Sequence, residues 1–178
     1  MNTTVSVYST VKDLWRDKID STMKAKENKA SHYKCDIKKD LIVFGTHHDT
    51  GSFGQMFVEQ LYPGRKAKQN SVQEYGCDWV SNNGMLIEIK TSTIDKKATY
   101  WFNQFYDAKK QKQKQYTHVA LVFLMPEKTQ VWLTTRADAT KMYQEGDTSN
   151  GKEIRVDEPE NDETFKKYFT LVADYDDE

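Results

Sequence analysis

Two acidic residues and a lysine lie close together near the middle of the sequence. Asp78 is followed, after nine intervening residues, by Glu88, Ile89 and Lys90. Side chains alternate along a β-strand, so Glu88 and Lys90 would share one face of a strand and Ile89 would point away. A short turn would let Asp78 approach Glu88 from the neighbouring strand. Two carboxylates and an ammonium group would then meet on one hairpin.

Such a trio suits metal-assisted hydrolysis of a phosphodiester. Mg2+ prefers hard oxygen ligands and retains several waters, so one or two carboxylates can hold it. We expect Asp78, Glu88 and the backbone carbonyl of Ile89 to bind Mg2+, and Mn2+ to be able to replace it. The ion would polarise the scissile phosphate and acidify a bound water. Lys90 would orient the attacking water and offset negative charge in the transition state.

The flanking sequence predicts the strands that would position these residues. Residues 75–80 and 85–90 are expected to be strands, joined by a tight turn, because the Asn-Gly pair between them tolerates positive φ angles. The apolar run at 118–124 is typical of a central strand that is covered on both faces. Residues 130–134 are expected to form the returning strand. Together with the helices, the predicted order gives an α/β sandwich with a mixed sheet.

A helix is predicted just before the hairpin, beginning near Ser52. Ser52 and Gln55 have the spacing of a capping box, and residues 46–51 before them read as a loop. Three apolar residues follow at helical spacing and predict one buried stripe: Phe53, Phe57 and Leu61. The run Tyr62-Pro63-Gly64 should end this helix.

Further helices are expected on either side of these elements. Apolar residues recur with helical spacing between 11 and 19, and residues 101–115 and 136–144 also read as helices. The apolar run at 41–44 is expected to be a strand or the last part of a packed segment. No internal repeat or flexible linker divides the chain. We therefore expect one α/β domain with a central mixed β-sheet flanked by helices.

With these elements in place, the sequence resembles the PD-(D/E)xK nucleases, the superfamily that includes restriction endonucleases. Cys77-Asp78 followed by Glu88-Ile89-Lys90 is similar to the motif, with a cysteine in place of the usual proline. Residues 51–59 resemble the first core helix of the superfamily. The resemblance covers about residues 51–137 and implies a restriction-endonuclease-like core. The whole chain, 1–178, would then be a single nuclease domain whose terminal segments serve dimerisation or DNA recognition.

The resemblance also extends the set of candidate site residues. It implies that Glu59, at the end of the first core helix, is a catalytic carboxylate on the metal side, although a surface position is equally open. Three basic residues just before the hairpin could grip the DNA backbone: Arg65, Lys66 and Lys68. Gln104 could approach a phosphate from the helix expected at 101–115. The basic run at 109–114 could also contact DNA or form a solvated face.

Composition limits the class of protein. The chain has 178 residues, of which 37% are hydrophobic and 12% aromatic, enough for one folded core. The formal net charge of −1 does not mark the whole molecule as a nucleic-acid binder, although acidic runs near the end can mask a basic face. Cys35 and Cys77 lack disulfide or zinc-ligand spacing and suggest a reducing, cytoplasmic location. No apolar run reaches membrane-spanning length, and we expect no signal peptide.

The expected function is a Mg2+-dependent DNA endonuclease of the type II restriction type. It would act on double-stranded DNA as a homodimer, because a symmetric cut of a duplex needs two active sites. One alternative keeps the site and changes the substrate, as in a Holliday-junction resolvase, a repair nuclease or a phage nuclease. Another is a non-catalytic module that uses a nuclease-like fold to bind DNA or a protein. In that case the trio would be a cross-strand charge pair on an exposed strand.

Overall fold

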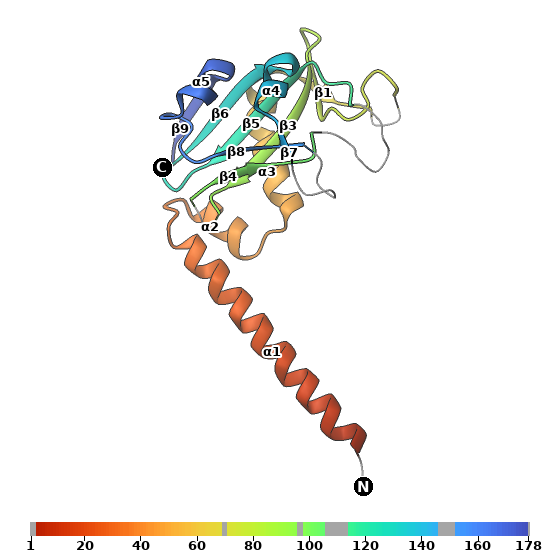
Figure 1. Cartoon of the computed structure of the whole chain (residues 1–178), viewed down its shortest axis with the longest axis vertical. Coiled ribbons are helices and arrows are strands. Elements are labelled where there is room, and N and C mark those ends of the chain that lie inside the picture. Colours follow the sequence, from red (N-terminus) through yellow and green to blue (C-terminus); the bar gives the residue numbers. More distant parts are fainter. Residues whose placement is uncertain (1–2, 69–70, 96–97, 106–113, 146–151, 178) are drawn as a thin grey trace.

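Two β-sheets with helices on either side make a mixed α/β fold (Figure 1). The structure is a computed structural model, and it describes residues 3–68, 71–95, 98–105, 114–145 and 152–177. The larger sheet is central, contains both parallel and antiparallel strands, and has helices on both faces. The sequence-based prediction of a central mixed sheet flanked by helices is therefore confirmed.

The main sheet contains six strands among the described residues, in the order β1-β2-β3-β5-β6-β9. Their bounds are Gly64–Lys66 (β1), Trp79–Ser81 (β2), Leu86–Thr93 (β3), His118–Leu124 (β5), Lys128–Thr135 (β6) and Thr170–Asp176 (β9). Strands β3 and β5 are parallel, and the other neighbours are antiparallel. A parallel pair needs a crossover, so the chain leaves this sheet after β3 and returns at β5.

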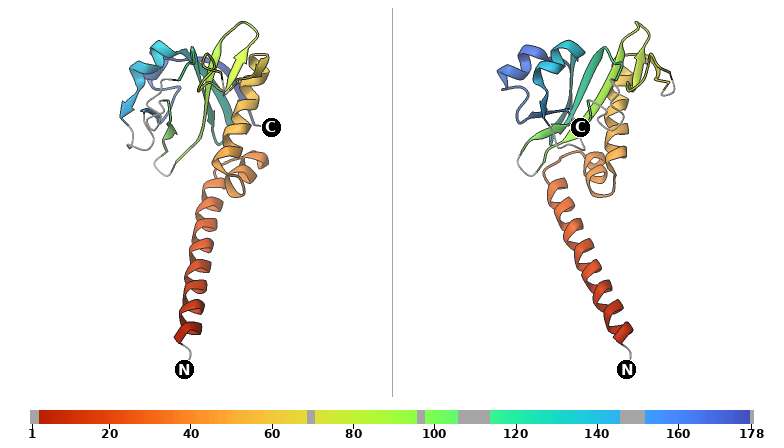
Figure 2. Two further views of the ribbon diagram at one scale, coloured as in Figure 1. Left: turned by 90° about the vertical axis from the view of Figure 1, so that its right-hand side faces the viewer. Right: turned by 45° about the vertical axis from the view of Figure 1, so that its right-hand side comes forward.

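The small sheet and the helices form the outer layers. The small sheet has the order β4-β8-β7, with β4 at Tyr100–Phe102, β7 at Gln144–Glu145 and β8 at Lys152–Val156. The helices are α1 (Thr3–Ala30), α2 (Asp36–Val43), α3 (His47–Leu61), α4 (Arg136–Met142) and α5 (Glu163–Tyr168). The left view of Figure 2 shows α3 on one face of the main sheet, and the small sheet with α4 and α5 on the other. Helix α1 projects away from this body (Figure 1).

Strand β5 is buried because a hydrophobic core lies on each side of it. Side chains of Val119, Leu121 and Phe123 belong to the core beneath the small sheet, α4 and α5. The alternate side chains Ala120 and Val122 belong to the core beneath α3. This arrangement confirms the prediction that 118–124 is a central strand covered on both faces. It also gives the two faces of the neighbouring strand β3 different surroundings.

Helix α3 begins earlier than the sequence predicts. Thr46 is its N-cap: Thr46 Oγ1 accepts a hydrogen bond from the Asp49 N–H (3.3 Å), and Asp49 Oδ2 accepts one from the Thr46 N–H (2.8 Å). This capping box has the same spacing as Ser52 and Gln55, which lie inside the helix. The predicted loop at 46–51 is therefore wrong, because the helix begins at the first of the two cap signals and not at the second. The predicted buried stripe is confirmed, since Phe53, Phe57 and Leu61 pack against the core beneath α3.

The helix predicted at 101–115 is wrong in its described part. Tyr100 and Phe102 are buried and Trp101 between them is exposed, which is the period of a strand, and β4 pairs with β8. Gln104 has a φ angle of 63°, outside the helical region. A partner strand far along the chain overrides the local helical pattern here.

Two predicted strands differ in type or extent. Residues 41–44 end helix α2 and its cap, so the strand alternative is wrong there. Strand β2 begins only at Trp79, later than the predicted 75–80. The tight turn between β2 and β3 is confirmed, and Gly84 has the positive φ angle of 87° that such a turn needs.

Helix α3 packs closely on β3 at Gly54. A Cβ atom on Gly54 would lie 2.0 Å from Thr91 Oγ1. We expect Gly54→Ala to destabilise the protein by about 1–3 kcal/mol, the usual cost of overpacking a core, as measured by urea unfolding. Gly51→Ala is the matched control in the same helix, because the described residues leave open space within 4 Å of a Cβ atom there. The control should be neutral or stabilised by up to about 1 kcal/mol, and equal stability of the two variants would contradict the close contact.

Candidate active site

Asp78 is held against β3 at the point where the β2–β3 ladder ends. The ladder pairs Trp79 with Ile87. One residue earlier, the Asp78 N–H donates to the Ile87 carbonyl (2.9 Å), and Asp78 Oδ2 accepts from the Ile89 N–H (2.7 Å). Asp78 Oδ2 thus accepts the hydrogen bond that a backbone carbonyl would accept if β2 continued to this position. Because the N–H and C=O of one strand residue point to the same side, the Ile89 carbonyl lies on the side of Asp78.

Glu88 and Lys90 lie on the face of β3 opposite Ile87 and Ile89, which pack beneath α3. The Glu88 side chain is only 1% exposed, and its Oε1 is 2.6 Å from Lys90 Nζ. The other oxygen, Glu88 Oε2, is buried and has no hydrogen-bond partner among the described residues. A buried carboxylate oxygen without a partner costs free energy, which a bound cation would offset.

A second lysine reaches the same carboxylate. Lys114 Nζ lies 2.6 Å from Glu88 Oε1, and the Lys114 side chain is 16% exposed. The next residue fixes this segment, because the Gln115 N–H donates to the Tyr75 carbonyl (2.7 Å). Sequence analysis does not single out Lys114, which is the last lysine of a basic run that reads equally well as a solvated face. The other basic residues of that run, at 109–112, lie outside the described residues.

Gly76 makes room for Lys114. Its φ angle is +75°, and a Cβ atom there would lie 2.4 Å from Lys114 Cγ. Glycine is the residue that satisfies both conditions without strain. The segment Gly76-Cys77-Asp78 therefore supplies one carboxylate directly and gives Lys114 its path to Glu88. This glycine is the one sequence signal that could have pointed to Lys114.

Asp78, Glu88, Lys90 and Lys114 together form what we call the charged cluster. Burial raises the pKa of Asp78 to about 6, the charge of Glu88 adds to this shift, and Lys90 and Lys114 oppose it. Burial by itself would lower the pKa of Lys90, but the charges of Glu88 and Asp78 outweigh it and the pKa is raised. Lys90 is therefore charged at neutral pH. Asp78 is therefore harder to ionise than an ordinary aspartate.

Glu59 is not brought together with the charged cluster. Its Oε1 accepts a hydrogen bond from Gln55 Nε2 (2.6 Å), one turn earlier on α3. That helix packs on the face of β3 away from Glu88. The charges that shift the pKa of Asp78 come from the cluster and not from Glu59. The geometry thus leaves Glu59 without a place among the ligands expected from the sequence.

The basic residues predicted to bind DNA have different surroundings. The Arg65 guanidinium donates to both carboxylate oxygens of Glu74 (2.9 and 2.6 Å), and this contact holds the pKa of Glu74 at about 2. Lys66 and Lys68 are exposed, in or next to β1. Gln104 is exposed after β4 and lies on no helix. Lys66 and Lys68 are therefore the cations in this set best placed to meet a phosphate.

The charged cluster contains oxygen atoms of the kind that Mg2+ prefers. Within the described parts of the chain, no three Asp, Glu, His or Cys side chains gather into a group able to hold a metal ion. Asp78 and Glu88 supply two carboxylates and Ile89 a backbone carbonyl, and Mg2+ commonly binds one or two carboxylates and keeps several waters. Glu88 Oε2 has no partner among the described residues, so a cation could contact this oxygen without breaking a hydrogen bond.

A function for this protein has to be argued from the geometry of the charged cluster, because the comparisons with known proteins found no match. The described helices include none that is both long enough and apolar enough to span a membrane. No protein-family model matches the sequence, and no curated protein is significantly similar to it.

Proposed function

We propose that the protein is a Mg2+-dependent deoxyribonuclease with a restriction-endonuclease-like core of the PD-(D/E)xK type. The observation that carries the proposal is the buried Glu88 Oε2, which lacks a partner while Oε1 of the same carboxylate contacts two lysines. A buried carboxylate with a purely structural role normally has both oxygens satisfied. The order of elements around it, a helix, a hairpin and then a parallel central strand, supports the same assignment.

The residues of the charged cluster have separable roles in this reaction. Asp78, Glu88 and the Ile89 carbonyl would hold Mg2+, which would supply Lewis acidity for polarising the phosphate and activating water. Lys90, fixed 2.6 Å from Glu88 Oε1, orients the attacking water. Lys114 brings a second positive charge to the same place and stabilises the negative charge that develops on the phosphate oxygens.

Within this class, we propose a type II restriction-type enzyme that cuts double-stranded DNA as a homodimer. Two strand cuts at one site need two active sites, and two copies of this chain supply them. Helix α1 is the segment available for pairing, because it projects from the body (Figure 1) with Trp15 61% and Ile19 47% exposed. Apolar side chains exposed on a projecting helix favour packing against another helix.

Incubation with supercoiled plasmid and with a long linear duplex, in Mg2+ or in EDTA, tests the proposed function. We expect discrete metal-dependent fragments that are absent with Lys90→Ala. Cutting of a four-way junction in preference to duplex would move the same site to a resolvase or repair role. Retention of DNA without cleavage in either Mg2+ or Mn2+ would overturn the nuclease and favour a non-catalytic binding module.

Lys66 and Lys68 give the proposed DNA contact its own test. Replacing both by alanine should weaken binding to all sequences alike. It should also reduce the slope of log affinity against log salt by about 1.8, since each phosphate contact contributes roughly 0.9. Fluorescence anisotropy in EDTA measures binding without cleavage.

The matched control removes the same charge elsewhere. Lys166 and Lys167 lie on α5, next to the opposite edge strand β9. Replacing both by alanine should leave the salt slope at its wild-type value. A wild-type slope for the Lys66 and Lys68 variant would exclude β1 from the DNA-binding surface.

A further inference from the structure

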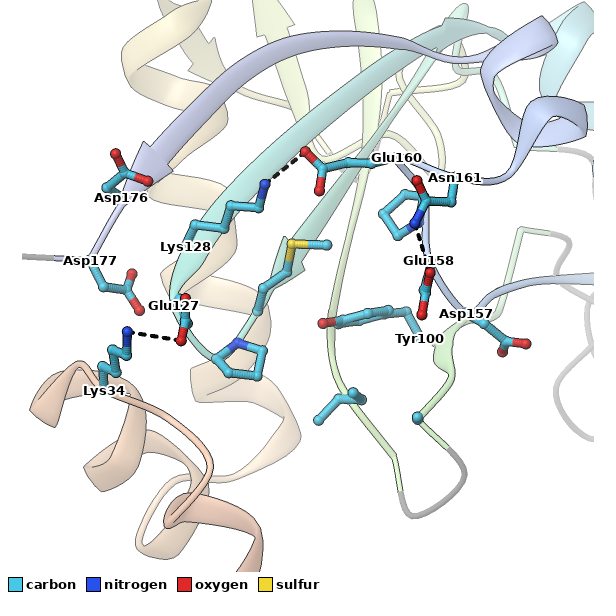
Figure 3. Close-up of a pocket in the computed structure, with 15 residues that line it drawn as sticks. Lys34, Tyr100, Glu127, Lys128, Asp157, Glu158, Glu160, Asn161, Asp176 and Asp177 are labelled. Carbon is cyan, nitrogen blue, oxygen red and sulfur yellow. Dashed lines mark hydrogen bonds and ion pairs between the residues drawn. The ribbon is translucent and has the colours of Figure 1, made fainter.

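A second candidate site lies away from the charged cluster (Figure 3). A cavity of about 840 Å3 opens between the β5–β6 turn, the loop after β8 and the end of β9. Its size is that of pockets which hold small organic molecules. None of the four residues of the charged cluster lines it. Its ligand is therefore independent of the proposed cleavage reaction.

One part of the cavity wall is apolar. It consists of Ile94, Met125, Pro126 and Pro159 together with the ring of Tyr100. Tyr100 is held rigidly, because its ring packs edge-on against Phe123 with 5.0 Å between the ring centroids. A ligand of this cavity therefore needs carbon atoms that can lie against apolar side chains.

The hydroxyl group of Tyr100 points into this cavity without a partner. The Tyr100 residue as a whole is only 3% exposed. No hydrogen bond of its hydroxyl is found in the described part of the chain, and this oxygen is not among the fully buried atoms that lack a partner, which fits an atom that faces the open space of the cavity. Figure 3 shows the oxygen directed toward the space between the surrounding side chains. This oxygen can accept a hydrogen bond from a ligand N–H group.

The positive charges of the cavity wall are already paired. Lys34 Nζ lies 2.8 Å from Glu127 Oε1, and Lys128 Nζ lies 2.7 Å from Glu160 Oε1. Both contacts are drawn in Figure 3. Neither lysine is therefore left to attract an anion into the cavity.

Three further carboxylates line the cavity with no ion pair among the described residues: Asp157, Glu158 and Asp176. Asp157 accepts a hydrogen bond from the Thr99 hydroxyl (2.6 Å), and Glu158 accepts one from the Asn161 amide (2.8 Å). Both contacts are to neutral groups and leave the negative charges in place. The wall formed by the described residues is therefore net negative.

We propose that this cavity binds an organic cation, an alkyl ammonium or guanidinium group carried on a short apolar chain. The carboxylates attract the charge, the apolar wall takes the chain, and the Tyr100 hydroxyl accepts an N–H hydrogen bond. A phosphate ligand, including DNA, is repelled by the same carboxylates.

Agmatine, which carries an amine and a guanidinium on a four-carbon chain, is the probe for a titration followed by NMR. We expect saturable shifts at Tyr100 and in the segment 157–161, and weaker binding as salt concentration rises. 1-Pentanol has a similar chain without charge and should bind at least tenfold more weakly. Equal binding of the alcohol, or the absence of saturable shifts in this cavity, would overturn the proposal.

Two variants test the residues. Tyr100→Phe should weaken agmatine binding about tenfold, because it removes a hydrogen bond to a charged group. Asp157→Asn should weaken it about threefold to tenfold by removing a rim charge. Asp17→Asn, an exposed change of the same kind on α1, is the control and should leave the affinity unchanged. Urea unfolding checks that each variant is folded, and wild-type affinity in both cavity variants would reject this cavity as the binding site.

The cation can be a free molecule or a basic side chain of another protein. A titration with a blocked peptide distinguishes these two sources. The peptide Gly-Gly-Arg-Gly-Gly, with both ends blocked, presents the same guanidinium on a backbone. Tighter binding of this peptide than of agmatine assigns the site to a protein side chain. Tighter binding of agmatine assigns it to a free cation, and binding of neither contradicts the proposal.

Discussion

Replacing Glu88 by glutamine should reduce Mg2+-dependent DNA cleavage by about 10³-fold or more, measured as the initial rate on plasmid DNA. The substitution keeps the size of the side chain and removes its charge. That charge would hold the ion, and it is also the group that Lys90 and Lys114 both contact at 2.6 Å. Both lysines would lose their position together with the metal.

Glu59→Gln is the matched control for this experiment. It makes the same chemical change on a glutamate that contacts Gln55 and is absent from the charged cluster. We expect its cleavage rate to stay close to that of the wild type. Loss of activity in Glu59→Gln together with normal activity in Glu88→Gln would reverse the assignment of the essential carboxylate.

The folded state of the variant has to be checked separately. Glu88→Gln leaves Lys90 and Lys114 without their buried counter-charge, which also costs stability. Circular dichroism and urea unfolding measure this cost. Lys90→Ala keeps the Glu88 charge and its contact with Lys114, so it provides an inactive variant with a smaller electrostatic penalty.

The hairpin and the shared face of Glu88 and Lys90 could be predicted from the sequence because both depend on neighbouring residues. Asn83-Gly84 determines a tight turn by its tolerance of positive φ angles, and strand alternation then fixes which side chains share a face. The doubly covered strand at 118–124 could be predicted for the same reason. Its apolar run is longer than one covered face would require.

Features that depend on distant segments could not be predicted in this way. Strand β4 has a helical pattern and becomes a strand because β8 pairs with it. Lys114 enters the site across the open position at Gly76, far away in the sequence. The cavity beside Tyr100 has walls from several separate loops. In each case the deciding partner lies outside any local window, so local propensity carries no information about it.

The start of α3 illustrates a different limit. Two capping signals lie close together there, one at Thr46 with Asp49 and one at Ser52 with Gln55, and both have the correct spacing. The upstream pair forms because the longer helix can still bury its apolar stripe against β3. Spacing alone does not rank two such signals. Only the packing of the helix decides between them.

Asp177→Asn should destabilise the protein by about 3 kcal/mol, the usual loss when one partner of a buried ion pair is removed. Asp177 and Lys38 are 7% and 2% exposed and lie 2.6 Å apart. Lys38 Nζ also donates to the carbonyls of Met125 (3.0 Å) and Lys128 (2.8 Å). The pair therefore joins the end of the chain to α2 and to the β5–β6 turn, and urea unfolding measures its contribution.

Glu127→Gln is the control for this pair, because it breaks the neighbouring contact between Lys34 and Glu127, whose side chains are 66% and 68% exposed. An exposed pair of this kind contributes about 0–1 kcal/mol.

A large difference between the two variants would mean that Asp177 is neutralised by Lys38 and adds no net charge to the cavity beside Tyr100. A similarly small loss in both would mean that the Lys38 pair is effectively solvated. Asp177 would then join Asp157, Glu158 and Asp176 in attracting a cation, and agmatine should bind less tightly to Asp177→Asn than to the wild type.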